Sequence, residues 1–261
     1  NATEKALLME LNNDKIMKDT RNISSFDRRS GRNGEERATE YIVERLQKAG
    51  VQTTIHRYPV WLSDPVEAKL WEDNIPENLL PCKPWSFGGT SNGVLCASAV
   101  FIANDELLSN PLELMVSRLN PKKQDLQGKI VVCRTTSPVA ILDAQDRGAV
   151  AVICVWARGN EELIHEGNVN FIWGQPEPWE YSMYPKLPVV IMAYAAGESL
   201  IGKLKNNKIK LRLLTNVEEK MWTIPVTEAI IPGQGEEFIL YGNHMDSWFY
   251  GACDNATGNA I

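Results

Sequence analysis

The most informative part of this sequence is the stretch Phe238-Ile-Leu-Tyr-Gly-Asn-His-Met-Asp-Ser-Trp248. Its apolar beginning, Phe238 to Tyr241, predicts a buried strand of a parallel sheet. Such a strand delivers His244 and Asp246 to its carboxyl end, where open α/β sheets place their ligands. Side chains two residues apart in extended chain point to one face. The carboxylate can therefore sit behind the imidazole, as the usual partner of a metal-bound histidine whose free ring N–H needs an acceptor.

A second oxygen donor follows in the glycine-flanked turn Gly251-Ala-Cys-Asp-Asn-Ala-Thr-Gly258. Asp254 lies there at a predicted helix start, close to the same strand end. Imidazole nitrogen and carboxylate oxygen are common zinc ligands, so His244 and Asp254 predict half of a metal site. A single His-x-Asp pattern also fits a hydrogen-bonded surface pair, and the metal interpretation therefore depends on the whole string with its glycines.

The whole string resembles the first zinc signature of the glutamate-carboxypeptidase-like family of di-zinc exopeptidases. The resemblance implies that His244 is a zinc ligand, that Asp246 is the catalytic carboxylate that orients it, and that Asp254 bridges both metals. It also implies two zinc ions, a peptide substrate and metal-assisted hydrolysis. The remaining groups of the family would follow Ile261: a Glu-Glu pair, a further acidic ligand and a second histidine.

We therefore expect an N-terminal portion of a longer zinc metallopeptidase, inactive alone because the catalytic base lies further on. Zinc should be absent from this portion or bound weakly, since two ligands are too few for a stable tetrahedral site. The full-length protein is expected to hydrolyse peptides or small acidic or amino-acyl substrates, and a homodimer is a further possibility. The sequence leaves open the substrate side chain and the choice between aminopeptidase and carboxypeptidase.

Two other functions fit parts of the chain. Some relatives in this superfamily keep the fold as receptors and have lost their metal ligands, but here both His244 and Asp254 are present. Alternatively, the middle of the chain is a peptide- or partner-binding module, and its attached catalytic part is incidental.

Composition excludes several function classes. The chain of 261 residues is 44% hydrophobic, enough for substantial cores, and its 33 acidic and 27 basic residues give a net charge of -6. This balance argues against a nucleic-acid-binding surface. No apolar run approaches the roughly 18 residues that a membrane span needs. Of the cysteines, Cys133 and Cys154 lie in apolar runs and are predicted to be buried thiols. The compartment stays open.

The predicted fold is α/β, in three blocks. In residues 1–61 the sequence pattern predicts helices near 2–18 and 35–48 and a strand over 51–60. This order resembles the first part of the peptidase domain in the same family. Residues 62–220 resemble an inserted protease-associated domain of mixed α+β structure, through the runs "GKIVV", "DRGAVAVI" and "LPVVIM". Residues 221–261 resume the incomplete zinc-exopeptidase sheet domain with a strand over Trp222–Ile231, and Ile209–Leu214 is predicted to be an edge strand.

An aromatic loop in the middle block is the other candidate site. By the resemblance, four of its residues reach toward the active-site cleft and line a substrate entrance: Trp173, Trp179, Tyr181 and Tyr184. These aromatics equally fit a loop that covers itself. His56 fits a surface or core position better than a ligand position, and His165 with its neighbouring glutamates fits a solvated acidic turn better than a metal cluster.

Overall fold

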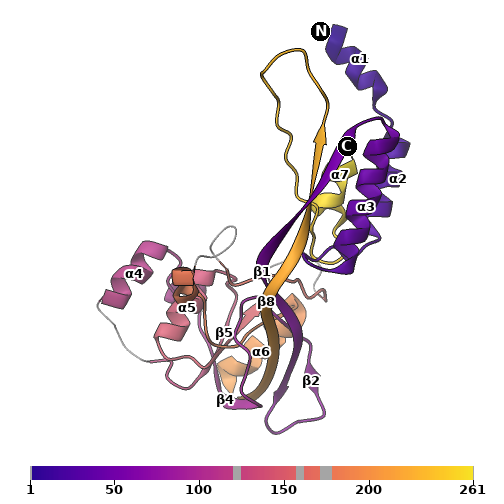
Figure 1. Ribbon diagram of the computed structural model, residues 1–261. Coiled ribbons are helices and arrows are strands. Elements are labelled where there is room, and N and C mark those ends of the chain that lie inside the picture. Colours follow the sequence, from indigo (N-terminus) through magenta and orange to yellow (C-terminus); the bar gives the residue numbers. More distant parts are fainter. Residues whose placement is uncertain (1, 120–124, 157–161, 171–177, 261) are drawn as a thin grey trace. The chain divides into compact units, whose positions relative to one another are not determined.

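The computed structural model describes residues 2–119, 125–156, 162–170 and 178–260. The chain divides into two units: one contains the residues up to Leu62 and those from Met221 onwards, and the other contains Ser63–Lys220. Helices and strands combine in a mixed α/β architecture with an eight-stranded sheet (Figure 1), which confirms the predicted fold class. The assignment of the middle of the chain as a protease-associated domain stays a prediction.

The sheet has the strand order β2-β1-β8-β4-β5-β6-β7-β3. Its central strands run parallel to one another: β4 (Leu95–Phe101), β5 (Ile130–Cys133), β6 (Ala151–Val155) and β7 (Val189–Met192). Antiparallel pairs extend the sheet on both sides of these strands. β1 (Gln52–Glu72) pairs with β2 (Leu79–Leu80), β3 (Lys83–Pro84) pairs with β7, and β8 (Lys210–Ile230) pairs with β4. The long strands β1 and β8 each carry the chain from one unit into the other.

Three of the parallel strands, β5, β6 and β7, are buried on both faces. Val131 and Val152 lie in one apolar cluster with α5 (Pro138–Asp146). Their neighbours Ile130 and Ile153 lie in a second cluster with α6 (Tyr194–Asn206). This alternation follows from the period of two in a strand, and burial on both faces explains the continuous apolar runs. Cys133 and Cys154, partners in the β5–β6 register, are buried free thiols as predicted.

The first unit contains helices from both ends of the chain. α1 (Ala2–Glu10) and α2 (Asn13–Ser24) replace the single helix predicted over 2–18. The helices separate at Asn12, whose side chain accepts a hydrogen bond from Lys15 N at 2.9 Å and so caps α2. The later elements of this unit are α3 (Asn33–Lys48), the turn η3 (Ala252–Ala256) and α7 (Thr257–Ala260). α2 packs against α3, η3 and α7 (Figure 1).

Two predictions about strands are wrong. Phe238–Tyr241 forms no strand, and its side chains are at least 75% exposed, because no strand in the described part of the chain pairs with it. Ile209–Leu214 is not an edge strand, since its residues from Lys210 onwards belong to β8, which lies between β1 and β4 in the sheet. The strand predicted over Trp222–Ile231 is confirmed as the continuation of that same strand.

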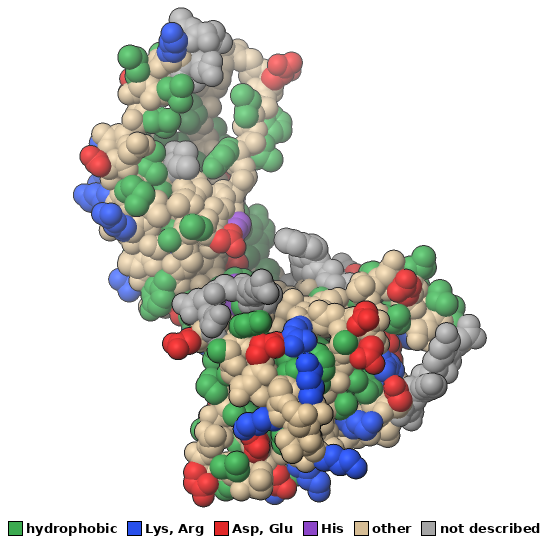
Figure 2. All heavy atoms as spheres, turned by 180° about the vertical axis from the view of Figure 1, so that it is seen from behind, with side chains coloured by type: hydrophobic (Ala, Val, Ile, Leu, Met, Phe, Trp, Pro, Cys, Tyr) green, Lys and Arg blue, Asp and Glu red, His purple; other side chains and the backbone are tan. Residues whose placement is uncertain are grey.

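The remaining elements lie in the second unit: the short helices η1 (Asn104–Glu106) and η2 (Pro178–Met183), and α4 (Pro111–Leu119). Figure 2 shows that Lys and Arg side chains are interspersed with Asp and Glu side chains on the visible face of this unit. None of the helices in the described ranges combines the length and the apolar character needed to cross a membrane.

The tight packing of α6 on the sheet can be tested at Gly197. A Cβ atom there would lie 2.3 Å from a methyl carbon of Val155, a buried residue of β6. We expect Gly197→Ala to lower the free energy of unfolding by about 1–3 kcal/mol, the usual cost of overpacking a core. Gly202, on the same helix, has open space around its Cβ position. Gly202→Ala should therefore stabilise by about 0.5–1 kcal/mol. Urea unfolding curves measure both, and a Gly197→Ala variant as stable as wild type would contradict this packing.

Candidate metal centre

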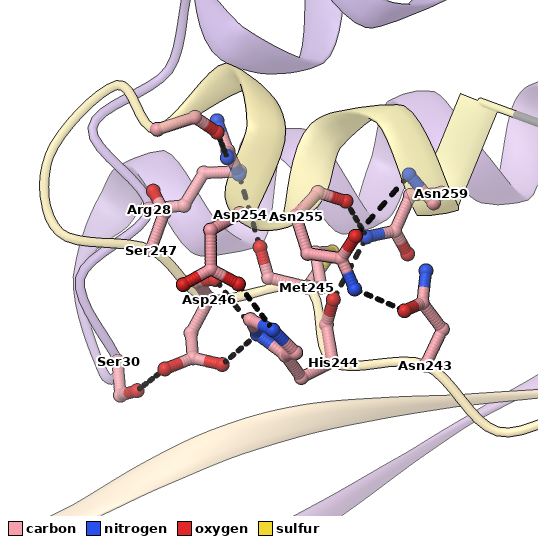
Figure 3. Close-up of polar contacts among 12 residues, drawn as sticks. Arg28, Ser30, Asn243, His244, Met245, Asp246, Ser247, Asp254, Asn255 and Asn259 are labelled. Atoms are coloured by element: carbon pink, nitrogen blue, oxygen red, sulfur yellow. Dashed lines mark hydrogen bonds and ion pairs between the residues drawn. The ribbon is translucent and has the colours of Figure 1, made fainter.

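The three residues that the sequence singles out lie together in the first unit, in a loop and not at the end of a strand. The metal loop, residues 242–251, carries His244 and Asp246, and η3 carries Asp254. The imidazole of His244 has a carboxylate on each side (Figure 3). Its Nδ1 lies 3.1 Å from Asp246 Oδ1, and its Nε2 lies 2.8 Å from Asp254 Oδ1. The peptide bond that follows Asp254 is cis.

This arrangement fits part of a zinc site. In the protonated ring Asp246 accepts a hydrogen bond from Nδ1–H and Asp254 accepts one from Nε2–H; once the Nε2 proton is lost, the lone pair of Nε2 would be available to a metal ion beside Asp254. One imidazole nitrogen and one carboxylate oxygen are suitable zinc donors, and the two side chains are 51% and 74% exposed, so an ion can reach them. Within the described ranges, no group of three or more His, Cys, Asp or Glu residues could hold a metal ion. The described residues thus place two suitable donors side by side, and a tetrahedral zinc site would need more.

The charges around His244 favour its protonated form when no metal is bound. Burial opposes this, because desolvation lowers the pKa of the imidazole. The charges and hydrogen bonds of Asp246 and Asp254 outweigh that effect and raise the pKa of His244 above 6.5. A metal ion must therefore displace a proton from Nε2 in order to bind there.

The segment Arg28–Ser30, which the sequence alone did not indicate as part of the site, forms hydrogen bonds with this loop. The guanidinium of Arg28 donates to the carbonyl of Met245 at 2.9 Å and to that of Gly251 at 2.5 Å. Ser30 Oγ lies 3.3 Å from Asp246 Oδ2, the oxygen that does not face His244. Asp246 is therefore held between a hydroxyl and an imidazole.

Asparagine side chains also form hydrogen bonds within and around the loop. Asn259 Nδ2 donates to the carbonyl of His244 at 2.8 Å and to that of Asn255 at 2.7 Å. Asn255 in turn donates to the side-chain oxygen of Asn243 (Figure 3). The residue before His244 and the residue after Asp254 are thus connected, which ties the two halves of the site together.

Glu35 fixes the turn that presents Ser30. Its carboxylate is buried, and this burial raises the pKa of Glu35 to about 7. A hydrogen bond from Gly31 N–H, at 2.7 Å, opposes the rise, and the negative charge of Asp246 adds to it. Gly31 has a φ of +75°, a conformation that favours glycine. A side chain at this position would also meet Trp222.

The other histidines lie elsewhere. His56 Nε2 is 3.0 Å from Glu228 Oε2, in a half-exposed pair in the first unit. The ring of His165 stacks on Trp156, with ring centroids 4.0 Å apart. The structure therefore gives each of these histidines a partner other than a metal.

The aromatic loop is described only in part. Trp173 and the side chain of Trp179 lie outside the described residues. Tyr184 is buried, with its ring 5.0 Å from that of Phe87 and 6.1 Å from that of Tyr181. Burial raises the pKa of Tyr184 to about 12. The role of these four aromatic residues in a substrate entrance stays a prediction.

The electrostatics of the site can be tested in metal-free protein. The pKa of His244, followed by NMR of its imidazole protons, should lie above 6.5, and Asp246→Asn should lower it because a charged acceptor is lost. The ion-pair contribution to stability is present at low pH and is lost as the pH rises through this pKa. Glu228→Gln, which removes a carboxylate beside His56 instead, should leave the value unchanged. A wild-type pKa at or below 6.5 would refute the arrangement.

Comparisons with known proteins show which chains are similar in sequence and in fold. No protein-family profile matches the chain. It is 24% identical over 306 residues to a probable glutamate carboxypeptidase from Zea mays, an alignment that covers 95% of this chain and 42% of that protein. Its fold matches an aminopeptidase from Aneurinibacillus sp. strain AM-1 (TM-score 0.61, 20% identity, 95% of this chain and 56% of the other). It also matches a zinc aminopeptidase from Bacillus subtilis (TM-score 0.63, 16% identity, 95% and 54%).

A peptidase M28 precursor from Shewanella amazonensis SB2B has the same fold (TM-score 0.61, 17% identity, 90% of this chain and 54% of the other). The chain spans about half the length of each of these structures and less than half of the maize protein. The predicted resemblance to zinc exopeptidases is therefore confirmed: the chain is similar in sequence to a probable glutamate carboxypeptidase and has the fold of zinc aminopeptidases.

Proposed function

We propose that this chain forms part of the active site of a zinc-dependent exopeptidase that hydrolyses peptide bonds. The observation that carries the proposal is the position of His244 between two carboxylates, with its Nε2 facing Asp254 at 2.8 Å. Similarity to a probable glutamate carboxypeptidase and to zinc aminopeptidases supports the same chemistry. Further ligands and a catalytic base are required for activity, and we assign neither to a residue of this chain.

Each residue has a distinct role in this proposal. Bound zinc would supply Lewis-acid activation of a water molecule and of the peptide carbonyl. His244 would bind the metal through Nε2, and Asp254, with two carboxylate oxygens, would bridge two zinc ions. Asp246 accepts the N–H of Nδ1, which fixes the ring orientation and makes the imidazole a better donor. The two carboxylates would also offset the positive charge of the metal.

The zinc assignment is tested by metal removal and mutation in the complete protein. Hydrolysis of small peptides should be lost on chelation and regained with added zinc. Asp254→Ala should nearly abolish activity, because a lost bridge disturbs both ions. Asp246→Asn should keep most of the zinc but lower turnover roughly 10–100-fold, since an amide accepts less strongly from Nδ1. Zinc content and kcat are measured for both variants.

The matched control is Glu237→Ala, which removes an exposed carboxylate from the segment just before the metal loop. It should leave zinc content and kcat unchanged. Full activity in Asp254→Ala would refute the hypothesis of a di-zinc site. Wild-type turnover in Asp246→Asn would show that Asp246 has no role in the mechanism.

We further propose that residues 62–220 are a protease-associated domain inserted into the peptidase domain. The compact unit Ser63–Lys220 and its sheet, with buried clusters on both faces, support an independently folding module.

A protein that consists of residues 62–220 alone should therefore unfold cooperatively in urea. Circular dichroism and tryptophan fluorescence should give coincident transitions. Transitions that separate, or a product without fixed tertiary structure, would count against this boundary.

A further inference from the structure

Arg28 is fully buried, and the carbonyl oxygens of four residues accept hydrogen bonds from its guanidinium. Nε donates to Met245 at 2.9 Å, and Nη2 donates to Gly251 at 2.5 Å. Nη1 donates to Ile23 at 2.7 Å and to Phe26 at 3.3 Å. An arginine remains charged in a protein, and a buried charge is tolerated only when hydrogen bonds satisfy it. These carbonyl groups are therefore necessary partners of the cation.

The four acceptors belong to two regions with different roles. Ile23 lies in the last turn of α2, where helix carbonyls have no partner within the helix. Met245 stands between His244 and Asp246, and Gly251 begins the turn that leads to Asp254. A single planar group thus connects the end of a helix to both arms of the candidate metal centre.

The two arms are the His244–Asp246 stretch and the Gly251–Asp254 stretch. A metal held by His244 and Asp254 depends on the spacing between these arms. The guanidinium contacts one arm through Nε and the other through Nη2, and its planar fork has a fixed shape. Backbone hydrogen bonds strengthen the same connection, from Arg28 N to Phe249 O and from Ser247 N to Arg28 O, both at 3.0 Å.

We propose that Arg28 is a positioning residue of the metal centre, which sets the spacing of its two arms, and that Ser30 completes this role by holding the carboxylate of Asp246. The inference rests on the proposed function, since it concerns the same zinc site. Arg28 acts through the backbone, since its guanidinium donates to carbonyl groups of the loop, whereas Ser30 acts on the carboxylate that orients His244.

The test is zinc affinity in the complete protein, measured by competition with a chromophoric chelator after metal removal. Arg28→Met and Arg28→Lys should both raise the Kd for zinc by about 10–100-fold, the usual effect of losing a group that orients metal ligands. Lysine keeps the charge, but a compact ammonium cannot connect both arms. The absorption spectrum of bound cobalt(II), a probe of ligand geometry, should change in both variants.

The matched control is Leu46→Ala, which removes a partly buried apolar side chain of α3 that is not one of the four acceptors of Arg28. It should lower the denaturant midpoint while leaving the zinc Kd and the cobalt spectrum unchanged. A general loss of packing would instead move all variants together. If Arg28→Met and Arg28→Lys do not fold, Ser30→Ala decides: it should weaken zinc binding several-fold, and Ser30→Thr, which keeps the hydroxyl, should restore it.

The outcomes separate this inference from the function on which it rests. Folded Arg28 variants with the wild-type zinc Kd and cobalt spectrum would overturn the positioning role and leave the zinc site intact. If the Arg28 variants do not fold, wild-type zinc affinity in Ser30→Ala would have the same meaning. A wild-type protein that binds no zinc, or whose affinity survives His244→Ala, would overturn the zinc site and the positioning role together.

Discussion

The metal loop forms neither a helix nor a strand, so its backbone hydrogen-bonding groups need partners outside regular secondary structure. Other segments of the first unit supply them. Arg28 binds two of its carbonyls and pairs with its backbone, and Asn259 binds the carbonyl of His244. The positions of His244 and Asp254 consequently depend on how α2, α7 and the segment after α2 pack together, and not on the loop sequence alone.

The second unit satisfies its backbone in the opposite way. There the parallel ladder from β4 to β7 pairs the strands directly, and side chains are free to fill the apolar clusters on both faces. A sheet of this kind tolerates little change in volume, because α5 and α6 lie close against it. The chain therefore combines a core defined by regular pairing with a site defined by irregular, side-chain-mediated contacts.

Regular strand pairing and irregular side-chain contacts differ in how far the sequence predicts them. The runs that became β5, β6 and β7 were predictable because each is a short apolar stretch bounded by turn residues. Phe238–Tyr241 has the same composition but forms no strand, since a strand also requires a partner, which local sequence does not reveal. A strand therefore depends on non-local pairing as well as on its own residues.

The candidate site shows the same division. His244, Asp246 and Asp254 were predictable because a short stretch of sequence contains all three. Arg28 was not, because the polar stretch from Arg28 to Gly34 is typical of an exposed turn. Its burial depends on contacts such as the one with Met245, 217 residues further along the chain. Only the folded arrangement distinguishes it from the neighbouring arginines.

The exposed run from Phe238 to Tyr241 has a consequence for the behaviour of this polypeptide in concentrated solution. Four consecutive apolar side chains on an unpaired backbone offer a template for intermolecular β-pairing, the first step of aggregation. Glu236 and Glu237 stand directly before them. Their negative charges would repel one another if copies stacked in register, which would oppose such pairing.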